Sequence, residues 1–342
     1  MAAHLVIDIF FCGRVLVVVR RGKIDDLVLR HVDKPVRLYR LRSSYRFQAN
    51  AVVAAGCDNG GNGVGFVPIT SEIAGFRQSV IHSFGGWNTS SILTSPSSQR
   101  LGINGFGYTP DSGNYVFYKG SHHYKHTSTF NTFRLFYASA YDQKARISIN
   151  KTDTRVLNLA ASETPAMVSV QADSIRQVSA RLNRGGITCF GASLEDETGI
   201  YIDNFAIKGD SGLGLQAIPE RNLAAFDSLL HYDLIVLQFG LNVSNSPSRD
   251  FTGYMKGMGR LINKLKAAFP DTPILLLSVS DRSQRRQGNF VTMPVIPVLI
   301  QAQEKIAYDN KLLFWNLFEA MGGENSMAAF ANAKPALANK DY

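Results

Sequence analysis

The pattern of apolar and polar residues divides the chain into regions of different character. From Gly199 onward, short continuous apolar runs alternate with segments of helical periodicity, which is typical of parallel strands joined by crossover helices. Strands are expected at 199–207, 232–239, 273–280 and 311–318, and helices at 217–230, 250–268 and 296–309. The last three contain short, continuous apolar runs, as expected of strands buried on both faces. This half therefore predicts a parallel α/β sheet.

The middle of the chain, residues 61–185, is different. Gly, Ser, Thr, Asn and Tyr dominate, and short alternating runs are separated by turn residues at near-regular spacing, which predicts an all-β sandwich. Near the N-terminus, residues 34–41 (KPVRLYRL) are expected to form the first strand of the α/β sheet. The chain is therefore divided into 1–60, a divergent segment with the first strand and helix, 61–185, the inserted sandwich, and 186–342, the remainder of the α/β domain.

Composition narrows the class of protein and of partner. Of 342 residues, 45% are hydrophobic and 18% charged, which excludes disordered, collagenous and coiled-coil classes. The net charge of +9 comes mostly from residues 1–46, and the rest lacks a basic stripe interleaved with aromatic residues, so no nucleic-acid partner is expected. No apolar run approaches the ~20 residues of a membrane span. The apolar stretch 5–19 contains Asp8 and Arg14 and is a poor signal peptide.

Cysteines and histidines predict neither a metal site nor a cofactor. The three cysteines lack the spacing of a zinc site or a disulfide framework. A cluster formed by His122, His123 and His126 has no nearby carboxylate or cysteine to complete a site, which favours a polar β-loop. No metal and no cofactor are therefore expected.

Polar residues follow two neighbouring strands of the predicted α/β sheet. Residues 209–212 (Gly-Asp-Ser-Gly) follow one strand and residues 238–242 (Gln-Phe-Gly-Leu-Asn) end the next. In open α/β sheets, ligands bind at the carboxyl ends of the strands, where Gly and Asn can donate hydrogen bonds to a developing oxyanion. A further carboxylate, Asp341, lies near the end of the chain. Ser, oxyanion donors and Asp together indicate acyl transfer.

Four runs in this half carry a resemblance to a known family. They are YDLIVLQFGLNV, ILLLSVSDRS, FWNLFEAMGGENSM and LANKDY. The chain resembles the SGNH (GDSL-type) hydrolase superfamily, and within it a bacterial subgroup, common in Bacteroidetes, with an inserted β-module. The resemblance covers 199–342 and, more loosely, 34–41 and 60–69. It implies an α/β fold class: a three-layer αβα flavodoxin-like domain with an inserted all-β sandwich.

The resemblance also assigns the oxyanion hole and the catalytic acid. Gly209 matches the oxyanion glycine of the second family block, which makes Ser211 a structural neighbour. The Gly-x-Asn-Asp block matches 240–243, which keeps Asn242 as oxyanion donor and has Val243 in place of the aspartate. Asp341 matches the start of the Asp-x-x-His block, whose histidine would be residue 344. We expect the chain ending at Tyr342 to be inactive without that base.

The nucleophile block of the family falls on residues 41–44. Ser44 takes the position of the nucleophile, with Arg42 and Ser43 where the family has Gly and Asp. Because an arginine lacks the backbone freedom of that glycine, residues 1–58 are either divergent or read in a shifted frame. Ser211 is the alternative nucleophile.

Each assignment has a structural alternative. Ser44 and Ser211 can be ordinary loop or turn serines, Gly209 and Asn242 can simply shape their loops, and Asp341 can be a solvated carboxylate. Gly240 and Asp281 lie on the edge expected to contact substrate, but Asp281 can equally form an ion pair or cap a loop.

Trp87 and four tyrosines of the insert can form a sugar-stacking platform or pack in the sandwich core: Tyr108, Tyr115, Tyr118 and Tyr124.

The expected function is that of an SGNH-type serine esterase acting on acyl esters, such as acetyl esters, of a glycan. Its partner would be an acylated carbohydrate or a small ester, and its location periplasmic or secreted, as in the family. The rival hypothesis is a non-catalytic glycan-binding protein, in which the sandwich binds and the hydrolase domain is a scaffold.

Overall fold

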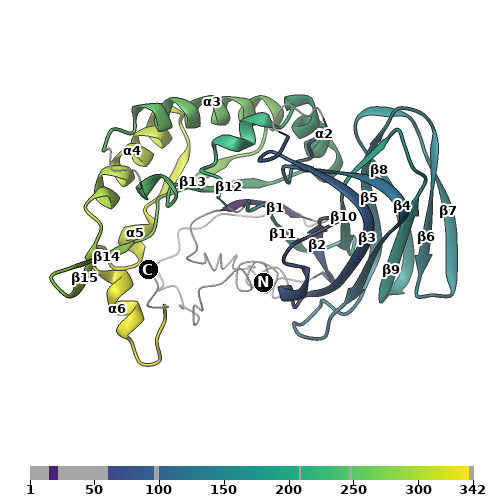
Figure 1. The fold of residues 1–342 in the computed structure, drawn as a ribbon, viewed down its shortest axis with the longest axis horizontal. Coiled ribbons are helices and arrows are strands. Elements are labelled where there is room, and N and C mark those ends of the chain that lie inside the picture. The colour runs from purple at the N-terminus through teal and green to yellow at the C-terminus, as the bar shows by residue number, and fades with distance from the viewer. Residues whose placement is uncertain (1–14, 22–60, 96–99, 208, 246–248, 339–342) are drawn as a thin grey trace.

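The computed structural model describes residues 15–21, 61–95, 100–207, 209–245 and 249–338. These residues form a large antiparallel β-unit beside a smaller α/β unit, as Figure 1 shows. The protein is therefore a mixed α/β structure. Residues 34–41, Ser44 and Asp341 lie outside the described residues.

The antiparallel unit contains nine strands among the described residues, in the order β7-β6-β9-β4-β10-β5-β8, with β2 beside β10 and β3 beside β4. The strands are β2 (Gly63–Val67), β3 (Val80–Ser91), β4 (Phe106–Gly120), β5 (Phe130–Ser139), β6 (Gln143–Ile149), β7 (Asp153–Leu159), β8 (Ser162–Ile175), β9 (Gln177–Leu182) and β10 (Ile187–Glu195). The alternation that predicted strands is visible in β6, where every second residue is buried.

The long strand β4 folds this sheet into two facing layers. It pairs with β10 near its start, at Tyr108, and with β9 near its end. One core contains Ile147 and Val178 from one layer together with Leu135 and Leu194 from the other, which is the packing of a β-sandwich. The sheet includes β10 and so continues past residue 185, where the sequence placed the end of the module.

The α/β unit has a mixed sheet in the order β11-β1-β12-β13-β16. Its strands are β11 (Ile200–Asn204), β1 (Val15–Arg21), β12 (Leu234–Gln238), β13 (Ile274–Leu277) and β16 (Leu313–Trp315). The last three are parallel, as expected, but β1 runs antiparallel to both β11 and β12. The four strands expected from the sequence therefore run in one direction, and the antiparallel strand β1 between two of them was not expected. Strand β12 is flanked by β1 on one side and by β13 on the other, and the expected strand at 34–41 stays a prediction.

Three amphipathic helices cover one face of this sheet: α2 (Glu220–Leu230), α3 (Thr252–Ala268) and α4 (Val295–Asp309). They begin and end close to their expected positions because their apolar residues recur at helical spacing, as Leu261, Ile262 and Leu265 do in α3. Those residues belong to the same buried cluster as Leu237 and Leu276 of the sheet. Figure 1 shows the three helices side by side above the strands.

The C-terminal part contains short elements that the sequence did not predict. A hairpin, β14 (Ser283–Arg286) and β15 (Asn289–Thr292), follows β13. The strand expected at 311–318 ends at Trp315, because Asn316 accepts a hydrogen bond from Glu319 N and caps α5 (Leu317–Ala320). Helix α6 (Ser326–Asn332) completes the described chain. None of the described helices is long and apolar enough to span a membrane.

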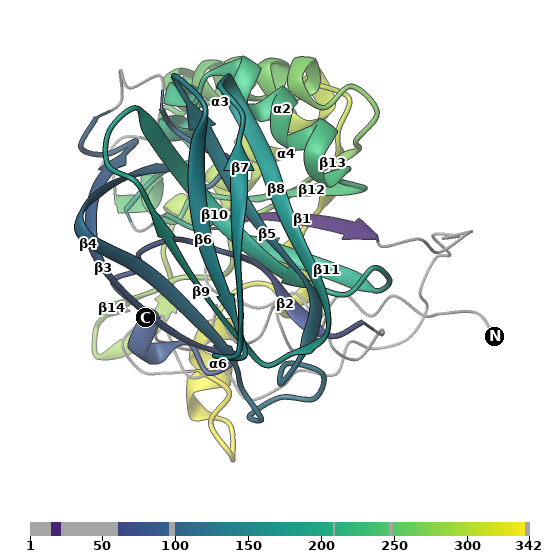
Figure 2. The same ribbon diagram turned by 90° about the vertical axis from the view of Figure 1, so that its right-hand side faces the viewer.

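Besides the core inside the sandwich, a second hydrophobic core is formed by residues of both units. Every residue of β10 is buried, and Phe66, Phe136 and Phe190 of the sandwich pack on Phe226 of α2 with ring centroids 5.5 to 6.5 Å apart. Figure 2 shows α2 lying across the end of the sandwich strands. We call this set of four phenylalanines the seam.

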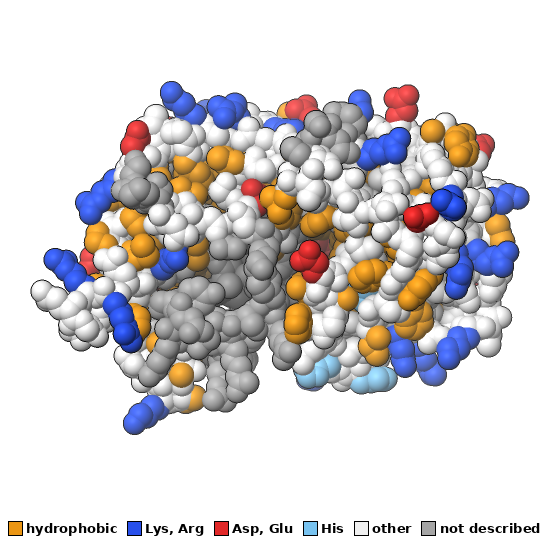
Figure 3. All heavy atoms as spheres, viewed as in Figure 1, with side chains coloured by type: hydrophobic (Ala, Val, Ile, Leu, Met, Phe, Trp, Pro, Cys, Tyr) orange, Lys and Arg blue, Asp and Glu red, His pale blue; other side chains and the backbone are white. Residues whose placement is uncertain are grey.

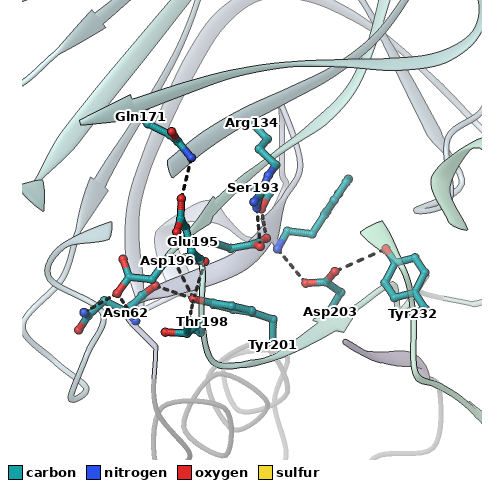
Figure 4. Close-up of polar contacts among 12 residues, drawn as sticks. Asn62, Arg134, Gln171, Ser193, Glu195, Asp196, Thr198, Tyr201, Asp203 and Tyr232 are labelled. Carbon is teal, nitrogen blue, oxygen red and sulfur yellow. Dashed lines mark hydrogen bonds and ion pairs between the residues drawn. The ribbon is translucent and has the colours of Figure 1, made fainter. Parts of the chain in front are cut away.

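Polar contacts also tie β11 to the sandwich (Figure 4). The Asp203 carboxylate accepts hydrogen bonds from Phe66 N at 2.8 Å and from the Tyr232 hydroxyl at 3.5 Å. The hydroxyl of Tyr201 in β11 accepts a hydrogen bond from Asp196 N at 2.8 Å and donates one to Asn62 O at 3.0 Å. These bonds fix how the α/β unit is joined to the sandwich.

Candidate functional site

Three segments that bear candidate residues come together at the carboxyl edge of the mixed sheet. Because β12 and β13 are parallel, the segments that follow them, 239–242 and 278–283, start from the same edge. The segment 209–214 follows β11, which runs in the same direction as β12 since β1 is antiparallel to both. We call these three segments the edge.

The segment 209–214 folds around a buried carboxylate. Asp210 is only 7% exposed, and its Oδ1 accepts a hydrogen bond from Gly214 N at 3.0 Å. Burial raises the pKa of this carboxyl group, and backbone N–H groups of the same loop oppose the rise. Gly209 has a φ of +86°, and no described atom lies within 4 Å of the place a Cβ would take. Among the residues that the structure describes, none fills the space beside the backbone of Gly209.

Asn242 joins the two candidate oxyanion segments. Its Nδ2 donates to the carbonyl oxygen of Asp210 at 2.7 Å, so the side chain lies against the segment that begins at Gly209. A side-chain amide has two N–H groups, and the second has no partner among the described residues. The structure thus brings Gly209 and Asn242 to one place.

The chain segments that follow β12 and β13 approach closely at Gly240 and are joined by hydrogen bonds of Gln303. Gly240 has a φ of +121°, and a Cβ there would lie 2.7 Å from Val279 Cγ1. Gln303, fully buried in α4, donates to Phe239 O at 2.7 Å and accepts from Val279 N at 2.8 Å. The sequence did not single out Gln303, although a polar residue on the apolar face of a helix was a signal that could have found it.

Asp281 and Arg282 fix the third segment. Asp281 is 1% exposed, and its carboxylate accepts from the Thr292 hydroxyl and from Met327 N, each at 2.8 Å. Arg282 donates to Leu241 O at 3.1 Å and to Ser244 Oγ at 2.9 Å. Asp281 therefore caps a loop, and its contact with substrate stays a prediction, as does that of Gly240.

The structure does not place a complete set of reacting groups. Ser44 and Asp341 lie outside the described residues, and Ser211 lies in the edge between Asp210 and Gly212, partly exposed. His231 caps the C-terminus of α2 with a φ of 50° and donates its backbone N–H to Asp227 O. It precedes β12 and therefore lies at the end of that strand opposite to Asn242.

The structure also bears on two other sequence hypotheses, the histidine cluster and the sugar-stacking aromatic platform. His122, His123 and His126 are exposed, and no group of three or more His, Cys, Asp or Glu in the described chain could hold a metal ion. Tyr108 and Tyr118 are buried in the sandwich core, so they cannot stack on a sugar.

Three of the aromatic residues proposed to stack on a sugar are not buried. Trp87 donates its ring N–H to Tyr115 O at 2.8 Å, and Tyr124 bonds to Gln78 at 3.3 Å. Trp87, Tyr115 and Tyr124 remain partly exposed.

Comparison with known proteins bears on the fold. No family model matches the chain, and no curated protein matches it. A peptidoglycan O-acetylesterase of known structure superposes with a TM-score of 0.63 at 16% identity, over 79% of this chain and 74% of that one. That share exceeds what either unit could supply, so the similarity includes both. At this identity it shows a shared fold.

Two further solved structures match more weakly. A family two carbohydrate esterase from Cellvibrio japonicus is 10% identical over 69% of this chain and 89% of that one. A family 29 carbohydrate binding module is 11% identical over 39% of this chain and 94% of that one. Both have a TM-score of 0.24, which is too low to support an argument about this chain.

Proposed function

We propose that this protein is an SGNH-type serine esterase that removes acyl groups, such as acetyl, from a glycan. Its α/β unit would be a three-layer αβα domain with the sandwich inserted into it, and the protein would act in the periplasm or outside the cell. The observation that carries the proposal is the hydrogen bond from Asn242 Nδ2 to Asp210 O, because it joins Asn242 to the segment that begins at Gly209, the other residue proposed as an oxyanion donor. The fold shared with an O-acetylesterase supports it.

The proposed reaction uses the edge to stabilise negative charge. A serine hydroxyl, Ser44 by position in the chain, attacks the ester carbonyl while a histidine oriented by Asp341 accepts its proton. Gly209 N–H and the free N–H of Asn242 then bind the oxyanion. The sugar hydroxyl leaves with the proton, and water releases the acid from the acyl-enzyme. The reaction needs neither a metal nor a cofactor.

Turnover by an Asn242→Ala variant tests the oxyanion hole. Loss of one such donor lowers kcat by about 10²–10³-fold. The matched control is Asn245→Ala, since Asn245 is exposed nearby and has no role in the proposal. Hydrolysis of p-nitrophenyl acetate and of acetylated xylan oligosaccharides is measured for both variants, each made in a protein that includes the histidine expected at position 344. Equal turnover by the two variants would contradict the assignment.

Labelling identifies the nucleophile. A fluorophosphonate reacts with an activated serine, and peptide mass spectrometry then locates it. We expect the label on Ser44; a label on Ser211 would transfer the role to that residue. Glycan binding with neither label nor turnover would favour the rival hypothesis of a non-catalytic glycan-binding protein.

A further inference from the structure

The hairpin β14–β15 continues from the third segment of the edge, and the proposed reaction does not use it. One side of its base is fixed to the segment that carries Asn242, because Arg282 bonds to Leu241 O and Ser244 Oγ. Met293 N donates to Arg282 O at 2.8 Å and closes the base of the hairpin. The hairpin therefore starts beside the candidate oxyanion hole.

The other side of the base is fixed to the start of α6. Thr292 N donates to Asn325 Oδ1 at 3.0 Å, and Asn325 N donates to Thr292 Oγ1 at 2.7 Å. Asp281 accepts from Thr292 and from Met327 N. With both sides held, the direction in which the hairpin points is set by the same residues that shape the edge.

The outer half of the hairpin is cationic and aromatic. Arg285 and Arg286 are exposed, and Phe290 is 36% exposed. The Arg285 guanidinium lies 5.2 Å from the centre of the Phe290 ring, and neither arginine forms an ion pair with a carboxylate of the described chain. Figure 3 shows Lys or Arg side chains at the end of the molecule where Figure 1 places β14 and β15.

We propose that this hairpin binds a carboxylate-bearing sugar next to the acylated one, so that the substrate is an acylated acidic glycan. This inference rests on the proposed function. Guanidinium groups bind carboxylates with two parallel hydrogen bonds, and an aromatic face packs against the C–H face of a sugar ring. Four residues of strand extend roughly 13 Å, so a contact near the tip of the hairpin would be made with a sugar next to the acylated one.

A neutral glycan fits this surface less well, because it would cover the two guanidinium groups without supplying charged acceptors. A nucleic acid is disfavoured as well: one arginine beside one aromatic ring, with a second arginine at the next position of the strand, does not form the basic, aromatic-lined groove that a nucleic-acid strand requires. An acidic sugar supplies a carboxylate for the guanidinium groups and a C–H face for the aromatic ring.

The experiment compares acetylated galacturonan oligosaccharides with acetylated xylan oligosaccharides. For R285Q/R286Q we expect kcat/KM on the acidic substrate to fall about 10–100-fold, mainly through KM, since each arginine loses a charged hydrogen bond. Turnover of the xylan substrate and of p-nitrophenyl acetate should be unchanged. The variant R285K/R286K, which keeps the charge but loses the planar geometry, should be intermediate. The control R146Q/R176Q removes two exposed arginines of the sandwich and should have no effect. An equal effect on both substrates, or none, would overturn the proposal.

A binding measurement separates failure of this inference from failure of the proposed function. Titration calorimetry with deacetylated galacturonan oligosaccharides needs no turnover. Absence of turnover on every ester, with binding that R285Q/R286Q weakens, would reject the esterase and keep the acidic-glycan site. Turnover without such binding, or binding that R285Q/R286Q leaves unchanged, would keep the esterase and reject this site.

Discussion

The seam and the edge are held by different interactions. At the seam, Phe66, Phe136, Phe190 and Phe226 pack ring against ring. At the edge, single side-chain amides hold backbone segments: Gln303 bonds to both strand ends, and Asn242 bonds to the neighbouring loop. Buried aromatic contacts contribute free energy roughly in proportion to the area they bury, whereas hydrogen bonds set direction and position. The seam therefore supplies stability and the edge supplies geometry.

The largest expected effect is at the seam. Phe226→Ala leaves a cavity among three other phenylalanines, so we expect the free energy of unfolding to fall by about 3–5 kcal/mol. The control Val156→Ala, on the exposed face of β7, should change it little. The free energy of unfolding of both variants is measured by urea titration, monitored by fluorescence and by circular dichroism. Because the two units share this core, both probes should report a single transition; two separate transitions would show that the units fold independently.

Gln303→Leu should have the next largest effect. The change leaves Phe239 O and Val279 N buried without partners, at about 1–3 kcal/mol each. Gln301→Leu is the control, since Gln301 lies on the exposed side of the same helix. Thermal unfolding compares the two variants. If Gln303→Leu is as stable as Gln301→Leu, the strand ends do not depend on this amide.

Sequence pattern was sufficient where burial is periodic. Helices α2 to α4 and the alternating strands of the sandwich were predicted because one face of each element is apolar. Strand β1 was missed because pairing partners are distant in sequence: Val17 pairs with Asn204 on one side and Val236 on the other. No local pattern encodes an antiparallel strand placed between two others.

Sequence pattern identified only part of the candidate site, because some of its residues depend on contacts between distant segments. Gly209 and Asn242 follow strands, and the sheet brings the ends of its strands together, so topology was sufficient to find them. Gln303 and the β14–β15 hairpin were missed because their roles depend on contacts across the fold. The continuous burial of β10 was missed as well, since its Thr, Gly and Ser residues do not distinguish a strand covered on both faces from a turn-rich segment.

A drop in pH should weaken the sandwich through His82. Burial lowers the pKa of this histidine to about 4, and its ring nitrogen contacts Ile69 O at 3.0 Å. Because the unfolded chain takes up a proton near pH 6.5 and the folded chain does not, stability is lost as pH falls from 6.5 toward 4. Between pH 7 and pH 5 the loss from this group is about 2 kcal/mol. His82→Gln should reduce the pH dependence of urea unfolding by that amount. An unchanged dependence would contradict the prediction.

The smallest effect on stability, and the one that most sharpens the comparison, concerns two matched glycines. Gly209 at the edge and Gly113 in β4 have φ values of +86° and +66°, and both have open space where a Cβ would lie. An alanine at either position should cost about 1 kcal/mol through backbone strain alone, so Gly209→Ala and Gly113→Ala should have equal thermal stability. Their turnover should differ: the new methyl group beside Gly209 displaces the ester oxygen from its donor, and a misplacement of this kind costs about tenfold or more. Gly113 is remote from the edge, and its variant should keep full activity. If both variants lose turnover alike, strain explains the loss and Gly209 has no special role; if neither does, the oxyanion is not bound at this glycine.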